Sequence, residues 1–351
     1  MNVISLDQET VKAAVYGGAV LGGGGGGWIS EGLENGRLAL ELGDPKLVAA
    51  GELNDEDIVV SVALVGAPAA KDQYVKPSHY VRAIQLLSEK AGGNIAGIIT
   101  NENGGGTTIN GWIQSALTGL TVVDAPCNGR AHPTGTMGSL NLTELDDYVS
   151  HQAAVGGKGD RYVESVVSGN LDKVSSVVRY LSIQAGGVVA VARNPVSVGH
   201  VKENGAPGAI QQAIEIGRSY LSHASGESII QEVVSKLNGR ILTSEEVTDA
   251  RLETKGGFDV GTVRLSDYEL SFWNEYMTAE KDEERLGTFP DLIMTLDTRT
   301  GKPVVTAEVQ KGQHLTVIHV PKEHLLLSTT MKNSKLLKAI EPIIEKKVVS
   351  L

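Results

Sequence analysis

Cysteine, aromatic residues and long apolar runs are all scarce in this chain of 351 residues. The single cysteine, Cys127, excludes an intrachain disulfide. No apolar run approaches the roughly 18 residues that a membrane helix needs, so we expect neither a membrane span nor a membrane partner. The N-terminus lacks the basic and then apolar pattern of a secretion signal. These absences predict a soluble cytoplasmic protein.

Basic residues are outnumbered as well. Lys and Arg total 31 against 42 Asp and Glu, which gives a net charge of −11. A diffuse acidic surface repels phosphate backbones, so we expect no nucleic-acid partner. Aromatic residues make up only 4%, so the cores must be aliphatic. The 42 glycines cluster between apolar runs, which is typical of tight turns, and the length suffices for two domains.

The first half of the chain alternates apolar strands with amphipathic helices. A helix, a glycine turn and a second helix are expected over residues 9–43, and further helices at residues 78–92 and 108–120. Strands are expected at residues 57–68, 97–100 and 121–126. This order predicts an α/β domain over residues 1–165, with a parallel or mixed sheet and covering helices.

The second half changes character along its length. Residues 142–173 have a helical, charged pattern, residues 180–198 fit a strand or a buried helix, and residues 208–221 fit an amphipathic helix. From Leu237 short alternating strands follow, with a hairpin turn at residues 298–303 and a last helix interrupted at Pro342. We therefore predict a second domain over residues 166–351 that is helical at first and then mostly antiparallel β.

Six consecutive glycines occupy residues 22–27. Such a turn resembles a phosphate cradle. However, no apolar strand precedes it and no Gly-Lys-Ser/Thr closes it, which excludes a P-loop. Glu41 or Asp44 lies near the distance of a ribose-binding acid in a dinucleotide site. Nucleotide binding therefore stays open, beside close helix packing or a backbone wall for an active site.

Two polar, glycine-rich loops follow two of the expected strands. The first spans Glu102 to Asn110, and the second spans Asp124 to Met137. Because ligands bind at the carboxyl ends of strands in open α/β sheets, we expect one site where these loops converge. The expected substrate-binding residues are glycines with accessible backbone N–H groups and two polar side chains that suit a small anion. They are Gly24, Gly25, Gly104, Gly105, Asn128 and Arg130.

The expected catalytic residues are two acids, one thiol and one imidazole: Glu102, Asp124, Cys127 and His132. Cys127 is a candidate nucleophile with His132 as its base, or simply a small buried hydrophobe. Asp124 or Glu102 could instead activate water. Asp124, Cys127 and His132 could also bind Zn²⁺, completed by Glu102 or a distant histidine, although their spacing matches no standard zinc motif.

Six short motifs, in order, carry a resemblance to a known family: LGGGGGGW, NENGGGTTIN, VVDAPCNGRAHP, GGFDVG, FWNEYM and FPDLIMTLDTRTGKPVVTAEVQKGQHLTVIHVP. Over nearly its whole length the chain resembles the S-methyl thiohydantoin desulfurase-like proteins. The resemblance implies an α/β amino-terminal domain and a β-rich carboxyl-terminal domain. It also implies hydrolysis at a five-membered cyclic amide-like ring, in the neighbourhood of hydantoinase-type enzymes.

The family pattern falls on particular residues here, with departures. Its acidic-Gly-Gly turn falls at Glu102 to Gly105, with Asn103 inserted, and its Gly-Arg-Ala signature falls at residues 129–131. Its Asn-Glu pair falls at residues 274–275, where strand alternation allows at most one of the two to face the site. The family commonly has a second aspartate where this chain has Pro126, and an apolar residue where it has His132.

The sequence thus favours a hydrolase that adds water, or Cys127, to a ring C=N or C=O carbon of a small hydantoin-like or thiohydantoin-like substrate. The alternative is a non-catalytic small-ligand-binding protein or a subunit of a hydantoinase-type assembly, because a carboxylate of the family pattern is missing at Pro126. No cofactor is certain from the sequence, and a divalent metal such as zinc stays open. A homo-oligomer is expected from general frequency.

Overall fold

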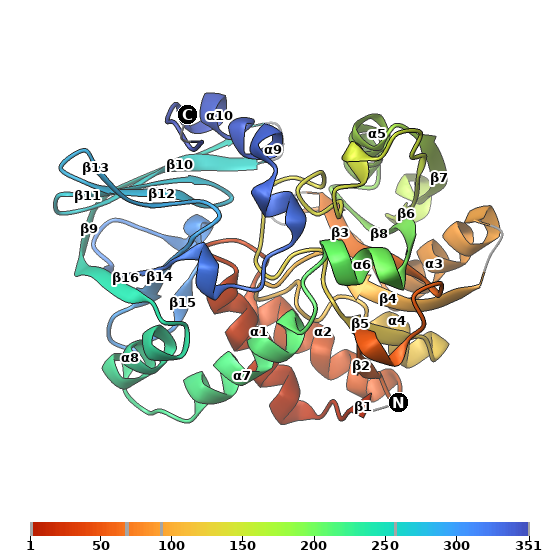
Figure 1. Cartoon of the computed structure of the whole chain (residues 1–351), viewed down its shortest axis with the longest axis horizontal. Helices are drawn as coiled ribbons and strands as arrows, with labels where there is room; N and C mark the ends of the chain where they lie inside the picture. The colour runs from red at the N-terminus through yellow and green to blue at the C-terminus, as the bar shows by residue number, and fades with distance from the viewer. Residues whose placement is uncertain (1–2, 67–69, 92–93, 256–257, 350–351) are drawn as a thin grey trace.

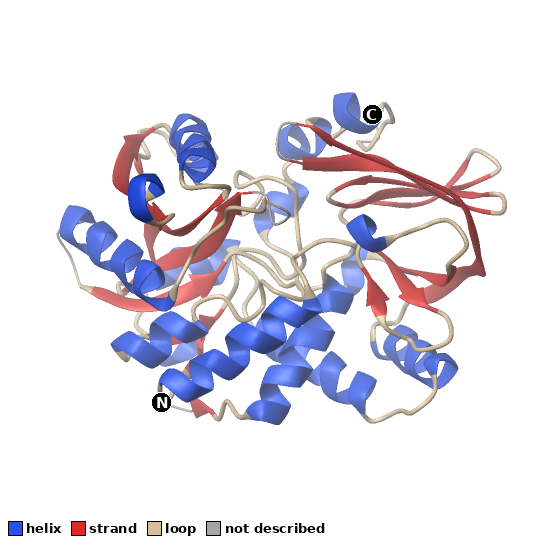
Figure 2. Cartoon of the chain, turned by 180° about the vertical axis from the view of Figure 1, so that it is seen from behind, coloured by secondary structure: helices blue, strands red, loops and turns tan. Residues whose placement is uncertain are grey.

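Two mixed or antiparallel sheets, each of eight strands, form the two lobes of the molecule (Figure 1). The computed structural model describes residues 3–66, 70–91, 94–255 and 258–349. Loops gather between the two lobes, and helices cover their outer sides (Figure 2). None of the described helices is long and apolar enough to cross a membrane.

The first sheet has the strand order β1-β2-β5-β4-β3-β8-β6-β7. Its centre is parallel, with β5 between β2 and β4, and β3 beside β4. The flanking strands β1, β8, β6 and β7 pair antiparallel. The strands are β1 Val3–Ile4, β2 Leu47–Ala49, β3 Ile58–Gly66, β4 Ile95–Thr100, β5 Thr121–Asp124, β6 Ser150–Gly156, β7 Val163–Gly169 and β8 Val188–Ser197.

Both faces of this sheet are covered, which follows from apolar residues at successive strand positions. On β3, Val62 packs in the core with Leu87 of α3, whereas the next residue, Ala63, packs with Val178 of α5. Successive strand residues point to opposite faces, so one helix must cover each face. The helices of this lobe are α1 Gln8–Leu21, α2 Ile29–Leu42, α3 Pro77–Ala91, α4 Trp112–Thr118, α5 Leu171–Gln184 and α6 Val198–Asn204.

The second sheet is antiparallel throughout, in the order β13-β12-β11-β10-β9-β16-β14-β15. Helices α7 and α8 join the lobes and pack on Leu292 and Ile318 of this sheet. The elements are α7 Ala209–Leu221, α8 Gly226–Lys236, β9 Arg240–Lys255, β10 Phe258–Leu265, β11 Tyr268–Trp273, β12 Glu275–Lys281, β13 Glu284–Thr288, β14 Leu292–Asp297, β15 Pro303–Val304, β16 His314–Val320, α9 Ser334–Lys338 and α10 Glu341–Ile344.

The two-part architecture and most expected elements are confirmed. The helix pair that flanks the glycine turn, the three parallel strands, α7 and the β14–β15 hairpin lie where the periodicity predicts them. The last helix is broken into α9 and α10 ahead of Pro342, which occupies the first turn of α10. The ends of two expected elements, at residues 67–68 and 92, and the glycines at 256–257 lie outside the described residues.

Two expectations are corrected. Residues 142–173 are not helical, because β6 and β7 form a hairpin there and α5 begins only at Leu171. The helix expected from Thr108 begins at Trp112, after Gly111 adopts a left-handed φ of 95°. Most of the charged residues that suggested a helix lie in turns and 3₁₀ segments, such as Glu144 and Asp160, and Glu164 is the only one of them on β6 or β7.

The sheet also crosses the expected domain boundary at residues 165–166. Strand β8 lies between β3 and β6, so residues up to Ser197 complete the first sheet. Strand β7 itself spans the boundary. The first lobe therefore depends on residues from both expected domains.

Candidate active site between the two sheets

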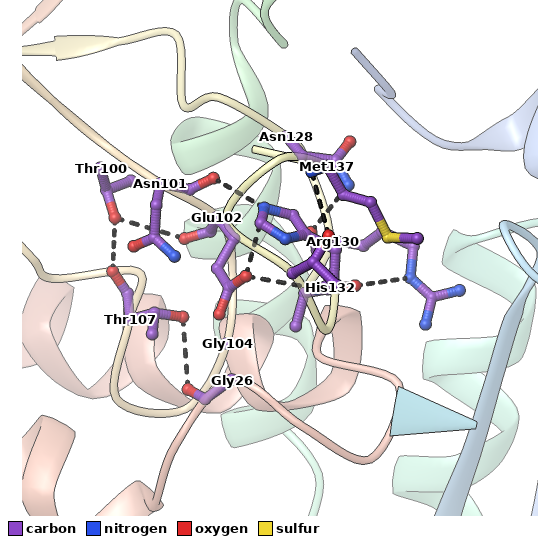
Figure 3. A network of polar contacts seen from close by, with 12 residues as sticks. Gly26, Thr100, Asn101, Glu102, Gly104, Thr107, Asn128, Arg130, His132 and Met137 are labelled. Atoms are coloured by element: carbon purple, nitrogen blue, oxygen red, sulfur yellow. Dashed lines mark hydrogen bonds and ion pairs between the residues drawn. The ribbon is translucent and has the colours of Figure 1, made fainter. Parts of the chain in front are cut away.

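The loops that follow β4 and β5 meet in the region between the two sheets (Figures 1 and 3). Oε2 of Glu102 on the first loop accepts a hydrogen bond of 3.2 Å from the backbone N–H of His132 on the second. Nε2 of His132 lies 3.4 Å from the same oxygen. The two polar loops that the sequence singles out are thus brought together.

Asn103 holds these loops in place. This buried side chain donates from Nδ2 to the carbonyl oxygens of Gly129 at 3.2 Å and of Ala209 at 2.7 Å. Its Oδ1 accepts from the Thr108 hydroxyl at 3.2 Å. The residue inserted into the family pattern therefore ties the first loop to the second loop and to the start of α7.

The glycine turn at residues 22–27 joins the loops to the second sheet. The carbonyl of Gly26 accepts from the N–H groups of Gly106 at 2.9 Å and Thr107 at 3.1 Å. The carbonyl of Gly24 accepts from the N–H of Thr306 at 2.9 Å. A side chain at position 26 would collide with the backbone of Gly104, so the two glycines allow this close approach.

Arg130 spans the two lobes. Its Nη1 donates to the carbonyl of Pro290 at 3.1 Å and to that of Asp291, and its guanidinium lies 4.6 Å from the ring centre of Phe289. Complete burial lowers the pKa of Arg130 to about 10, so it stays a cation at neutral pH. Its Nη2 is buried and has no hydrogen-bond partner among the described residues.

Two carboxyl groups from opposite lobes lie beside this arginine. Glu102 is 6% exposed and Glu275, at the start of β12, is 2% exposed. Burial raises the pKa of Glu102 to about 7. Burial raises the pKa of Glu275 well above its ordinary value, and the charge of Glu102 raises it further. Burial and mutual repulsion therefore favour retention of a proton by this pair of carboxyl groups.

Glu275 meets the glycine turn directly. A side chain at Gly25 would overlap Oε1 of Glu275, so only glycine leaves room for this carboxyl group. The other oxygen, Oε2, is buried without a partner among the described residues. The preceding Asn274 faces away, since its Oδ1 accepts from the N–H of Asp259 at 2.9 Å. Only Glu275 of the Asn-Glu pair faces the cluster, but the reason is not strand alternation, because Asn274 is a turn residue with a left-handed φ of 57° between β11 and β12.

The imidazole and the thiol of the second loop are both neutral. Burial, aided by the positive charge of Arg193, lowers the pKa of His132 to about 4. Cys127 is 0% exposed and packs with Val59, Ile99 and Val123 in an apolar core. Burial raises the pKa of Cys127 to about 12, which keeps the thiol protonated at neutral pH.

Asp124 and Asn128 make structural contacts. The carboxylate oxygens of Asp124 accept from the N–H of Ile210 at 2.7 Å and from that of Gln211 at 3.1 Å, in the first turn of α7. Asn128 donates to the carbonyl of Arg130 at 2.9 Å and accepts from the N–H of Ser328 at 3.1 Å. Burial raises the pKa of Asp124 to about 6, against the opposing effect of its two backbone donors.

Two sequence models of one family match this chain in succession. The "S-Me-THD-like, N-terminal domain" matches residues 9–165, and the "S-Me-THD-like, C-terminal domain" matches residues 169–333. The chain belongs to the S-Me-THD-like family. No curated protein matches it.

One solved structure reproduces the fold of this S-Me-THD-like chain. It is an X-ray crystal structure of a protein from Chromobacterium violaceum, with 21% sequence identity and a TM-score of 0.69. The alignment covers 95% of both chains. At this identity the likeness shows a shared fold of both lobes and carries no statement about activity.

The zinc set considered for this family member is not assembled. Within the described ranges, no group of three or more His, Cys, Asp or Glu side chains could hold a metal ion. The physical reason is that Asp124 engages the N-terminus of α7 and Cys127 points into an apolar core. Glu102 and His132 alone are too few for a structural zinc shell.

Arg193 lies close to the buried charged residues of these loops, although no sequence motif marks it. It lies on β8, is 5% exposed, and is close enough to Glu102, Cys127 and His132 to affect the pKa of each. The sequence does contain an indication of its importance, because Arg193 interrupts the apolar run that forms β8. A charged residue inside a buried strand is rare unless it is paired or used.

The cluster is closed to solvent in this structure. Glu102, Arg130, His132 and Glu275 are all buried. The structure also shows two surface pockets, of about 840 Å³ beside α3 and of about 800 Å³ beside α5, and neither is lined by a residue of the two polar loops. These four side chains therefore have little contact with solvent in this S-Me-THD-like chain.

Proposed function

We propose that this chain is a hydrolase of small five-membered rings of the thiohydantoin class, with its site between the two sheets. One observation carries the proposal. Two buried carboxyl groups with raised pKa values, Glu102 and Glu275, come from opposite lobes and lie near the buried Arg130, and Glu275 contacts the glycine turn. Strongly perturbed acids gather at catalytic sites far more often than elsewhere. Membership of the S-Me-THD-like family supports the choice of ring.

The two acids divide the proton transfers between them. Ionised Glu102 takes a proton from water while the water oxygen bonds to the ring carbon that carries the S-methyl group, and Glu102 passes this proton to the ring nitrogen. That carbon's bond to sulfur then breaks, and protonated Glu275 gives its proton to the departing sulfur. As the ring C=O forms, the proton of the added hydroxyl returns to Glu275. In sum, one water proton ends on the ring nitrogen and the other on sulfur, so hydantoin and methanethiol are the products.

Arg130 acts on the charge that develops during this reaction. The addition of water pushes negative charge onto the ring, and a fixed guanidinium in a buried site stabilises it strongly. Nη1 of Arg130 is held by the carbonyls of Pro290 and Asp291, which leaves Nη2 for the substrate. Cys127 has no part in this scheme, because a thiol with a pKa of about 12 supplies almost no thiolate at neutral pH.

The test compares turnover of an S-methyl thiohydantoin by the wild type and by Glu102→Gln. Removing the base is expected to lower kcat about 10²–10⁴-fold. Wild-type kcat/KM should rise with pH through about 7, because Glu102 must lose its proton to act as a base. The acid limb should vanish in the variant. Released methanethiol, measured with a thiol reagent, gives the rate.

Two controls make this test decisive. Glu323→Gln changes an exposed glutamate on the second lobe and should leave both rate and pH profile unchanged. Glu275→Gln should lower kcat as Glu102→Gln does. If Glu102→Gln and Glu275→Gln both keep wild-type turnover, the proposed chemistry is wrong. A wild type that binds the ring in calorimetry without converting it would instead be a small-ligand-binding protein.

A further inference from the structure

Arg193 is a buried cation whose side chain has no hydrogen bond or ion pair among the described residues, although the charge of Glu102 acts on it. Arg193 is 5% exposed, and its Nε is buried with no hydrogen-bond partner among the described residues. None of the ion pairs among the described residues includes it, and the neighbouring acid Glu102 lies 3.4 Å from Nε2 of the neutral His132. Its backbone is paired with β3, and the Ser61 hydroxyl donates to its carbonyl oxygen at 3.3 Å.

Such a cation is costly, since a buried charge needs a partner that replaces its water. The folded chain keeps it in the middle of a sheet, between β3 and β6. Buried arginines that pair only through a bound molecule are found in anion-binding sites, where the planar fork matches a carboxylate. The missing partner of Arg193 is thus a ligand group.

Side chains around Arg193 favour one negative charge over two. The buried cluster contains two guanidinium groups, those of Arg130 and Arg193, and two carboxyl groups, Glu102 and Glu275, whose pKa values burial raises, so that positive charge outweighs negative charge. A monoanion would balance the remaining positive charge. A dianion such as a phosphate monoester would leave an excess negative charge in a buried region, which is unfavourable.

We infer that Arg193 is the receptor for a carboxylate carried by the substrate, so that the preferred ring bears an acidic side chain. The inference rests on the proposed function for the identity of the ring, but the anion site itself follows from the unpaired guanidinium. Arg193 binds the carboxylate by its fork and thereby orients the ring towards Glu102. It is a specificity residue and takes no part in bond breaking.

The approach to this guanidinium runs past Gly135. A methyl group at that position would lie 3.1 Å from Nη1 of Arg193, which is tighter than an ordinary contact. Gly135 is only half-buried, and it belongs to the loop that follows His132. Its lack of a side chain leaves the space that a carboxylate needs beside Nη1.

The experiment uses two five-membered S-methyl thiohydantoins that differ in one group, a carboxymethyl or the matching carboxamide on the ring. The wild type should prefer the carboxylate by about 10- to 100-fold in kcat/KM, as expected for a charge-assisted hydrogen-bonded pair. Arg193→Gln should reduce that preference towards unity, mainly through KM. Arg264→Gln, an exposed arginine paired with Glu269 on the second lobe, is the matched control and should keep the preference.

Two further measurements keep the inference testable if Arg193→Gln fails to fold. Gly135→Ala retains the charge but crowds Nη1, and it should lower the carboxylate preference. Calorimetry of the wild type with the carboxymethyl hydantoin, the product analogue, should show binding that the carboxamide lacks.

The outcomes separate this inference from the proposed function. Equal turnover of both rings by the wild type overturns the anion site and leaves the hydrolase intact. Binding of the carboxylate that depends on Arg193, without any turnover, supports the anion site and contradicts the hydrolase. Failure to bind or convert either ring overturns both.

Discussion

At the scale of single residues, burial decides the chemistry more than residue type does. Glu102 and Glu275 are common acids whose pKa values rise because water is excluded from them. The pKa of His132 is lowered to about 4, because burial disfavours its cationic form. The imidazole of His132 is neutral above about pH 5, so it does not neutralise Glu102. The backbone N–H of His132 instead holds the orientation of the Glu102 carboxyl group.

Cys127 provides a direct test at this scale. Cys127→Ala should keep turnover close to wild-type, because the thiol is fully buried among aliphatic side chains and lies outside the proposed proton transfers. In the native protein the thiol should react with a disulfide reagent far more slowly than in urea, since both access and thiolate are missing. Rapid labelling of the native thiol with parallel loss of activity would restore the nucleophile hypothesis.

The reactive loops were visible as patterns of residue type, but the roles within them were not. Glu102, Arg130 and His132 could be picked out because charged residues followed expected strands. The packing of Cys127 into an apolar core depends on which face of its loop turns inward, and that depends on β3 and β4. No local pattern encodes this choice.

At the scale of elements, the start of α7 is held by a side chain from β5. Asp124 accepts from two N–H groups in the first turn of α7, although it lies 86 residues from Ile210. A negative charge at a helix N-terminus also interacts favourably with the helix dipole. Gly208 precedes α7 in a left-handed conformation with no side-chain cap of its own, so Asp124 serves as a distant cap.

Removing that cap should cost stability more than it costs chemistry. Asp124→Ala is expected to lower the free energy of unfolding by about 2 kcal/mol, the upper range for a lost helix cap. Urea denaturation measures the change, and kcat of the folded variant should stay near wild-type. Ser225→Ala, which removes the local cap of α8, is the matched control and should cost about 1 kcal/mol. A variant that is stable but has lost kcat would return Asp124 to the catalytic group.

Elements with strong periodicity were predictable, and elements with mixed composition were not. The amphipathic pattern of residues 208–221 specifies α7 locally. The β6–β7 hairpin has charged residues mainly in the turns beside its strands, and the composition of the whole stretch resembles a polar helix. Pairing of β6 with β8 makes this segment a strand, and such pairing depends on residues far away in the sequence.

At the scale of the whole molecule, the two lobes share contacts that make them interdependent. Strand β8 completes the first sheet from beyond residue 165, and Arg130 binds carbonyl groups of the second lobe. The glycine turn bonds to Thr306 and Tyr276 on one side and to Gly106 on the other. Closure of the site and cohesion of the lobes therefore depend on the same segments.

This arrangement predicts that a fragment of residues 1–165 does not fold alone. Without β8, strands β3 and β6 would lose the neighbour that pairs with both of them and would expose unpaired edges. The fragment should lack a cooperative thermal transition by circular dichroism, whereas a fragment of residues 1–222, which retains β8 and α7, should be more ordered. A sharp, reversible melt of the shorter fragment would show instead that the lobes are separable domains.

The sequence by itself determined the class of the fold, the order of most helices and strands, and two polar loops at strand ends, because periodicity and turn residues act over short stretches of chain. Tertiary structure alone decided that Glu275 meets Gly25, that Nε of Arg193 has no hydrogen-bond partner among the described residues, and that Asp124 caps α7. Those outcomes depend on contacts between residues far apart in the chain and on the exclusion of water around them. Burial then sets which acid keeps its proton, a property that no residue carries in isolation.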